Sequence, residues 1–293
     1  MRVFLTGATG FIGSRIVPEL IAAGHQVLGL TRSDAGAQAL ADAGAEPYRG
    51  TIEDVDGLRL AAAQADAVIH TAFDHDFSNF VANCEKDRRV ILGLGAELKG
   101  TDKPPIITSG VGMGQTHHGA LATEDVFNPN DPNPRVASEI AGNELLAEGV
   151  DVRVMRLPQV HDRFRQGLIS PYIEIAREKG VAAYIGEGSN RSPAAHVSDV
   201  PKLYALALDR GQPGGRYHAV AEEGVPLREI AEVVAKKFGL STASLSPEEA
   251  AAHFGWFALF ASLDMPASSA WTRAQLGWQP TGPGLMTDLE NAG

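Results

Sequence analysis

One short segment near the N-terminus constrains the fold more than any other part of this 293-residue chain. A short expected strand at residues 2–5 leads directly into the segment TGATGFIG at residues 6–13, and helical spacing follows. Glycines at this spacing between a strand and a helix allow a tight turn, a close approach of backbone to phosphate, and close packing of helix on strand. The N–H groups that open the helix favour an anion. The segment therefore predicts a bound nicotinamide dinucleotide. The residues expected to line its site are Gly7, Thr9, Gly10, Phe11, Ile12 and Gly13.

The residues after the next expected strand, at residues 26–30, indicate whether the dinucleotide is NAD(H) or NADP(H). An acidic residue directly after such a strand binds the ribose 2′-hydroxyl of NAD(H). This chain has Arg32 and Ser33 there, and the arginine can form a bidentate pair with the 2′-phosphate of NADP(H). Asp34 argues for NAD(H), because a shift of two residues would place its carboxylate near the ribose. We favour NADP(H) over NAD(H), although Arg32 could equally be a solvated surface charge.

Short apolar runs alternate with helical patterns through the first half of the chain. The expected strands are residues 2–5, 26–30, 46–48, 67–70, 105–108 and 152–156. Such alternation builds a parallel sheet with helices on both faces. After about residue 158, glycine and proline become more frequent and the strict alternation ends. We therefore predict an α/β fold: a Rossmann-type doubly wound domain over residues 1–160 and a smaller, mostly helical substrate-binding lobe over residues 161–293, some of which can return to the first domain.

Composition narrows the range of partners. The net charge is −11 and no cluster of Lys and Arg stands out, so nucleic acid is not an expected partner. No apolar stretch is long enough for a membrane span, and the single cysteine, Cys84, suits a reducing compartment. These features favour a cytoplasmic protein that does not bind membranes. His75 lies between two aspartates, but the spacing fits no familiar motif, and no metal is expected. The long helical stripes over residues 77–98 and 137–148 could pair in a homodimer or pack only on their own sheet.

Further segments carry a resemblance to a known family. AVIHTA at residues 67–72, IITSG at 106–110, RLP at 156–158 and AHVSDV at 195–200 join the glycine segment. Together they resemble an extended short-chain dehydrogenase/reductase, similar to the NAD-dependent epimerase/dehydratase branch. The resemblance covers nearly the whole chain and implies a dinucleotide across the carboxyl edge of the sheet, with a substrate pocket between the lobes. It adds Thr71, Ala72, Ser109 and Pro158 to the expected cofactor site.

The catalytic positions depart from that family, which uses Ser or Thr with a Tyr and a Lys four residues apart. Ser109 fits the first role, but Arg135 stands where the tyrosine is expected and Glu139 where the lysine is expected. No Tyr-x-x-x-Lys occurs in the sequence. This pattern resembles the atypical members of the superfamily, which keep the nucleotide turn and lose the catalytic pair. An arginine cannot act as an acid, since its pKa lies above ~12, but it can bind an oxyanion. An ion pair between Arg135 and Glu139 would explain the two residues equally well.

Histidines offer another source of protons, because imidazole titrates near neutral pH. His161 follows the RLP segment and is expected near the nicotinamide. His117 and His118 lie in the glycine-bounded loop after the fifth strand, where we expect them to contact a small-molecule substrate. Arg191 joins them as a substrate residue, because similar enzymes that act on nucleotide sugars often carry an arginine there to bind a phosphate. The candidate catalytic residues are thus Ser109, His161, Arg135 and Glu139.

Three functions stay open. The first is an NADP(H)-dependent oxidoreductase that reduces a small carbonyl compound. The second is a protein that binds NADPH and senses its ratio to NADP⁺ without turnover, which the missing Tyr and Lys favour. The third is an epimerase, isomerase or lyase that retains the fold. The loop apparatus after Ser109 inclines us towards an enzyme.

Overall fold

A parallel sheet of seven strands forms the larger part of the molecule, as the alternating pattern predicted. The computed structural model describes residues 1–292. The strands are β1 (Arg2–Thr6), β2 (Gln26–Thr31), β3 (Glu46–Arg49), β4 (Ala67–His70), β5 (Pro105–Gly110), β6 (Arg153–Leu157) and β10 (Arg216–His218). Their order is β10-β6-β5-β4-β1-β2-β3, with all neighbours parallel. The order reverses between β1 and β4, where this topology opens a crevice for ligands at the carboxyl ends of the strands.

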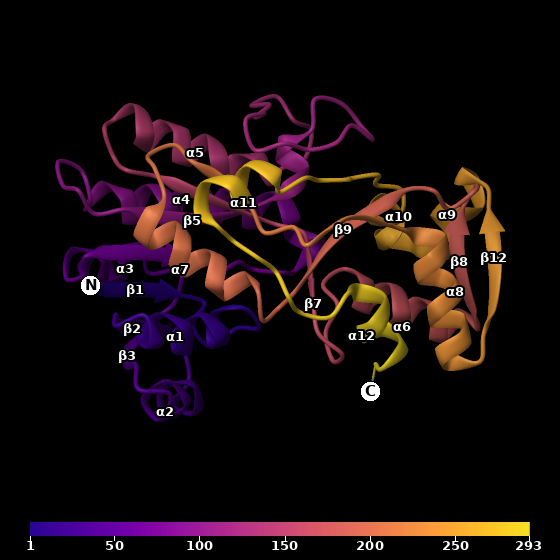
Figure 1. Ribbon diagram of the computed structural model, residues 1–293, viewed down its shortest axis with the longest axis horizontal. Helices are drawn as coiled ribbons and strands as arrows, with labels where there is room; N and C mark the ends of the chain where they lie inside the picture. The colour runs from indigo at the N-terminus through magenta and orange to yellow at the C-terminus, as the bar shows by residue number, and fades with distance from the viewer. Residues whose placement is uncertain (293) are drawn as a thin grey trace.

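Helices cover both faces of this sheet (Figure 1). One face carries α1 (Gly13–Ala22), α2 (Asp34–Asp42), α7 (Val200–Arg210) and α11 (Ala270–Leu276). The other carries α3 (Val55–Ala63), α4 (Phe80–Ala96) and α5 (Val136–Ala147). Successive side chains of a strand point to opposite faces. Accordingly, Val3 and Leu5 of β1 belong to the core cluster beneath α1 and α7, while Phe4 belongs to the cluster beneath α3, α4 and α5.

The smaller lobe mixes strands and helices, so the prediction of a mostly helical lobe is incomplete. It holds a three-stranded sheet of order β11-β9-β7 and a two-stranded sheet of order β12-β8. The strands are β7 (Gln159–His161), β8 (Val181–Ile185), β9 (Arg191–His196), β11 (Glu222–Pro226) and β12 (Ser241–Leu245). The helices are α6 (Ile169–Lys179), α8 (Leu227–Phe238), α9 (Pro247–Phe254), α10 (Ala258–Ala261) and α12 (Leu285–Glu290). Between these segments α7, β10 and α11 return to the large sheet, so the chain crosses between the two parts several times (Figure 1).

Short 3₁₀ turns connect some of these elements: η1 (Phe77–Asn79), η2 (Val111–Gly114) and η3 (Gly255–Phe257). The two long helices expected at a dimer interface, α4 and α5, pack against each other, and Arg88 of α4 binds Glu144 of α5 at 2.7 Å. A homodimer through them stays a prediction. Within residues 1–292, no helix combines the length and the apolar character needed to cross a membrane.

Candidate active site

The glycine segment forms a tight turn between β1 and α1. Gly7 adopts a φ of +70°, and a Cβ there would lie 2.6 Å from Thr71 Oγ1 and 2.8 Å from the nitrogen of Ala72. A Cβ on Gly13 would lie 2.1 Å from the carbonyl oxygen of Gly7, so α1 can approach the turn only without a side chain there. Gly10 donates its N–H to that same carbonyl at 2.8 Å and remains exposed on the outside of the turn. A side chain at Gly10 would fill the surface that a pyrophosphate needs, so the turn fits that ligand.

The start of α1 adds positive charge to this turn. Ile12 is the N-cap residue of α1, and Phe11 precedes it. The Phe11 ring lies 4.9 Å from the guanidinium carbon of Arg15 and 5.7 Å from that of Arg165. Arg15 also binds Asp162 at 2.9 Å, which ties α1 to the segment after β7. The first N–H groups of a helix have no acceptor within the helix, so they can receive an anion beside these arginines.

The end of β2 lies next to the glycine turn. Ser33 accepts a hydrogen bond from the N–H of Gly36 at 3.1 Å and is the N-cap of α2. A Cβ on Gly36 would lie 3.2 Å from Cγ2 of Thr9, so the turn and the start of α2 are neighbours. Arg32 is exposed at this edge. The structure therefore brings together the residues expected around the adenosine end of a dinucleotide.

Ser109 and Arg135 both lie at the carboxyl end of β5. Ser109 is 3% exposed, and its hydroxyl has no hydrogen-bond partner within residues 1–292. Arg135 immediately precedes α5 and donates through Nη2 to the carbonyl oxygen of Thr108 at 2.8 Å. Its Nη1 contacts Asp87 Oδ2 and Ser138 Oγ, both at 2.5 Å. The residue in the tyrosine position is thus beside the serine, with part of its guanidinium bound to the protein.

A buried polar chain behind Arg135 was not predicted. Asp87 accepts from Ser138 at 2.6 Å and lies 2.9 Å from His70 Nε2, while His70 Nδ1 lies 2.7 Å from Thr6 Oγ1. Burial alone would raise the pKa of the Asp87 carboxyl, but Arg135, His70 and Ser138 together hold that pKa well below its usual range. The position of Asp87 on the apolar stripe of α4 is the feature of the sequence that could have indicated this buried network. The network fixes the position of Arg135 relative to β4 and β5.

Comparisons with known proteins agree with this geometry. A family model described as NAD(P)H-binding matches residues 7–121. The chain is 46% identical over 290 residues to the Schizosaccharomyces pombe protein C2A9.02, covering 99% of this chain and 98% of that one. It is 37% identical over 292 residues to the Saccharomyces cerevisiae protein YLL056C, with coverage of 99% and 98%. The chain belongs to one family with these two fungal proteins.

The fold is shared with solved dehydratase and epimerase structures. The structure of DesIV, the dTDP-glucose 4,6-dehydratase of Streptomyces venezuelae with NAD and TYD bound, superposes with a TM-score of 0.78. The match covers 100% of this chain and 95% of DesIV at 20% sequence identity. At that identity the likeness establishes the fold, including the sheet edge at which Ser109 and the glycine turn lie.

Glu139, in the lysine position of the superfamily, has a different partner from the one predicted. It makes two ion-pair contacts of 2.8 Å with Arg156 and one of 3.1 Å with Arg216. The proposed pair with Arg135 is wrong, because Arg135 precedes the helix and turns towards α4 while Glu139 faces β6. Burial alone would raise the pKa of the Glu139 carboxyl, but Arg156 holds it below its usual range. Ser109 faces this carboxylate without forming a properly directed hydrogen bond.

His218 completes the buried cluster around Arg156. Its Nε2 lies 3.2 Å from Arg156 Nη1, and its Nδ1 lies 2.8 Å from the carbonyl oxygen of Ser268. An arginine can only donate and a carbonyl can only accept, so the ring is neutral with its proton on Nδ1. Burial, reinforced by the charge of Arg156, lowers the pKa of His218 to about 3.

This low pKa predicts that the protein loses stability in weak acid. An unfolded histidine titrates near 6.5, so between pH 6.5 and about 3 the unfolded chain binds a proton at His218 that the folded chain does not. The free energy of unfolding therefore falls as the pH falls, by about 2 kcal/mol between pH 7 and pH 5 from this group. Urea denaturation at both pH values measures the loss, and His218→Gln removes this part of it. An unchanged pH dependence in the variant would contradict the assignment.

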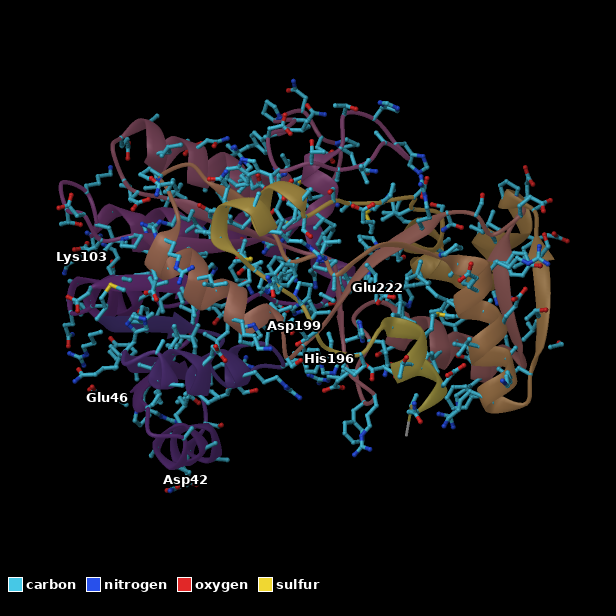
Figure 2. All side chains as sticks on the ribbon, in the orientation of Figure 1. Asp42, Glu46, Lys103, His196, Asp199 and Glu222 are labelled. Carbon is cyan, nitrogen blue, oxygen red and sulfur yellow. The ribbon has the colours of Figure 1, made fainter. Side chains whose placement is uncertain are left out.

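His161 lies in the smaller lobe rather than beside Ser109. Its Nδ1 is 2.7 Å from Asp288 Oδ2, its Nε2 is 3.9 Å from Glu222 Oε2, and its ring is 5.7 Å from that of His196. Figure 2 shows His196 and Glu222 where the lobe meets the large domain. Burial lowers the pKa of His161, although Asp288 partly offsets this effect. None of these contacts lies on β5 or in the loop after it, so the structure does not support His161 as the proton source there.

The expected substrate residues lie close together, but Arg191 is already paired. Its Nη2 donates to the carbonyl oxygen of Gly119, the residue after His118, at 3.2 Å. Arg191 makes a bidentate pair with Asp264, at 2.9 Å through Nε and 2.8 Å through Nη2, so the carboxylate takes the fork that a phosphate would need. His117 and His118 are exposed in the loop after β5. Pro158 forms the link between β6 and β7, where the chain first passes into the lobe.

Proposed function

We propose that the protein is an NADPH-dependent reductase of a ketone or aldehyde in which Ser109 holds the carbonyl oxygen. The observation that carries this proposal is the buried, unpartnered hydroxyl of Ser109. A buried polar group without a partner costs about 1–3 kcal/mol, so its presence needs an explanation. A carbonyl oxygen bound at this edge of the sheet would accept its hydrogen bond. Curated relatives that are 26–29% identical over more than 80% of this chain are dehydrogenases, dehydratases and reductases.

The residues at the sheet edge would hold the cofactor along its length. The glycine turn would bind the pyrophosphate, Arg32 and Ser33 the 2′-phosphate, and the segment at Thr71 and Ala72 the nicotinamide half. Once bound there, a reduced nicotinamide supplies the hydride that carbonyl reduction requires.

Ser109 and Arg135 would serve the oxygen of the substrate. Carbonyl reduction places one proton on that oxygen. Ser109 would donate it and take a proton back from a water molecule, which leaves as hydroxide and is neutralised by solvent. A guanidinium has five N–H donors, and contacts to the protein engage three of those of Arg135. The remaining N–H donors would stabilise negative charge as it develops on the oxygen. Arg135 needs no proton transfer for this role, which suits its high pKa.

Two measurements on the purified protein test the function. Calorimetry with NADPH should show heat that saturates as the binding site fills. In a panel of aldehydes and ketones, some compounds should cause the protein to oxidise NADPH, measured as a fall in absorbance at 340 nm. Tight NADPH binding without consumption by any carbonyl compound would contradict the reductase. That result would favour a sensor of NADPH instead.

The choice of cofactor rests on Arg32. Replacing Arg32 with alanine is expected to weaken NADPH binding by roughly one to two orders of magnitude, because a charged hydrogen bond to the 2′-phosphate contributes roughly 1.5–3 kcal/mol. NADH binding should hardly change. Arg2→Ala is the matched control, since Arg2 lies at the opposite end of β1 and binds Glu46. Calorimetry on the three proteins decides, and equal losses for NADPH and NADH in the Arg32 variant would refute the assignment.

A further inference from the structure

A set of aromatic side chains joins the two parts of the molecule near Ser109. We define the aromatic bridge as Phe73, Phe77 and Phe80 from the region after β4, with Trp256 and Phe260 from η3 and α10. The rings of Phe77 and Trp256 are stacked, with centroids 5.9 Å apart and an interplanar angle of 15°. Phe77 also meets Phe260 edge to face at 5.2 Å. The bridge is therefore a continuous set of rings, some from the segment after β4 and the others from η3 and α10.

We infer that this bridge receives an aromatic ring of the substrate, so that the preferred substrates are uncharged aromatic ketones or aldehydes. This inference rests on the proposed reductase function and specifies its substrate class. Offset-stacked and edge-to-face ring pairs contribute about 0.5–1.5 kcal/mol beyond the area they bury. A surface with several such rings distinguishes a flat aromatic group from an aliphatic group of similar size.

The bridge begins at the proposed oxyanion site. The guanidinium carbon of Arg135 lies 4.1 Å from the centroid of the Phe73 ring. The same guanidinium binds the carbonyl oxygen of Thr108, the residue before Ser109. A carbonyl group held by Ser109 would therefore extend its attached ring along a surface that starts at Phe73. Arg135 connects the polar and aromatic parts of the site.

Phe260, at the other end of the bridge, lines a small pocket beside the loop after β5. A cavity of about 30 Å³ is bounded by Phe257, Phe260, Met265 and Gln159, among other residues. A Cβ on Gly112 would lie 3.2 Å from the sulfur of Met265, which places this cavity next to the loop that follows Ser109. Such a volume holds about one water molecule and is too small for a ring. The substrate ring would instead take its place at the bridge itself, between Phe77 and Trp256. Trp256 is 56% exposed and can move into solvent.

The charges around this space argue against an anionic substrate. Arg191 is paired with Asp264, and Arg135 is paired with Asp87. Neither arginine therefore offers an uncompensated positive charge to a phosphate. An uncharged aromatic compound requires none, and it gains from the apolar surface instead.

The test compares three ketones on the NADP⁺-loaded protein. Acetophenone and cyclohexyl methyl ketone differ mainly in aromaticity, while 4-acetylphenyl phosphate adds a charge. Calorimetry and tryptophan fluorescence measure binding, and initial rates with NADPH measure turnover. We expect acetophenone to bind about three- to tenfold more tightly than the cyclohexyl ketone and to change the fluorescence of Trp256. The phosphate should bind more weakly than acetophenone.

Variants from both sides of the bridge locate the ring. Trp256→Leu and Phe77→Leu should each weaken acetophenone binding about three- to tenfold and leave the cyclohexyl ketone nearly unchanged. Trp271→Leu is the matched control, because Trp271 of α11 is 42% exposed and lies outside the bridge. Its ring stacks on that of Tyr217 in β10, with the centroids 5.6 Å apart. Two variants guard against a folding defect in one of them, and melting temperatures identify such a defect.

The outcomes separate this inference from the proposed function. Equal affinity for the aromatic and cyclohexyl ketones, tighter binding of the phosphate, or equal effects of the Trp256 and Trp271 variants would overturn the ring site. Turnover of aliphatic ketones without aromatic preference would leave the reductase standing. Trp256-dependent binding of acetophenone without turnover would overturn the reductase while locating a ring at the bridge.

Discussion

Replacing Glu139 with alanine is expected to lower the free energy of unfolding by about 3–5 kcal/mol, because it leaves Arg156 buried without its counter-charge. Both side chains of this pair are fully buried, and two contacts of 2.8 Å hold them together. Removing one partner of such a pair uncovers the desolvation cost of the other. Arg156 also donates to the carbonyl oxygens of Thr123 and Val126, so its displacement would loosen the loop between β5 and α5.

Two comparisons sharpen this result. The double variant Glu139→Leu with Arg156→Met removes both charges and should recover a substantial part of the lost stability, because apolar residues of similar volume often replace a buried pair without loss. Arg88→Ala provides a surface control, since its pair with Glu144 is about one-third exposed on the arginine side and should contribute at most ~1 kcal/mol. Chemical denaturation measures all three. A loss below about 1 kcal/mol for Glu139→Ala would show that the pair does not hold this loop.

Local pattern was enough to predict the large sheet. Gly7 specifies the turn through its positive φ, and Gly10 and Gly13 through their close approach to Gly7, so most of the needed information lies in one short segment. The expected strands likewise agree with β1 to β6; all but β3, which has the exposed sequence EPYR, are short apolar runs bounded by turns. Periodicity reports the local preference of a segment, and here that preference agrees with the strand pairing that the folded chain supplies.

The partners of charged residues could not be predicted in this way. Arg191 meets Asp264, 73 positions along the chain, and His161 meets Asp288, 127 positions along. Only the folded chain brings these groups together. Each pair occupies a residue that the sequence had offered for another role, Arg191 for binding the substrate and His161 for catalysis. The two-stranded sheet of the lobe was missed for the same reason. Its strands β8 and β12 are separated along the chain by a long stretch that includes β9 and α8. Propensity at short exposed strands is weak against such tertiary pairing.

Ser109→Ala is expected to reduce kcat about 10²–10³-fold while NADPH binding stays nearly unchanged. Removing one positioned donor to a developing oxyanion has a cost of this order, and the hydroxyl of Ser109 makes no contact that the fold requires. Because the interaction would form mainly in the transition state, kcat and kcat/KM should fall together. Steady-state rates with the best carbonyl substrate and calorimetry with NADPH measure the two quantities.

A second buried serine makes this expectation specific. Ser269 is as buried as Ser109, at 3% exposed, but its hydroxyl donates to the carbonyl oxygen of Val220 at 2.6 Å. Ser269→Ala should therefore lower the free energy of unfolding by about 1 kcal/mol and leave kcat unchanged. Ser109→Ala should do the reverse, lowering kcat with little change in the free energy of unfolding, since its hydroxyl faces Glu139 without a hydrogen bond of good geometry. If Ser109→Ala instead destabilises the fold and preserves kcat, the hydroxyl has a protein partner, and the proton and oxyanion roles assigned to it must belong to another group at the sheet edge.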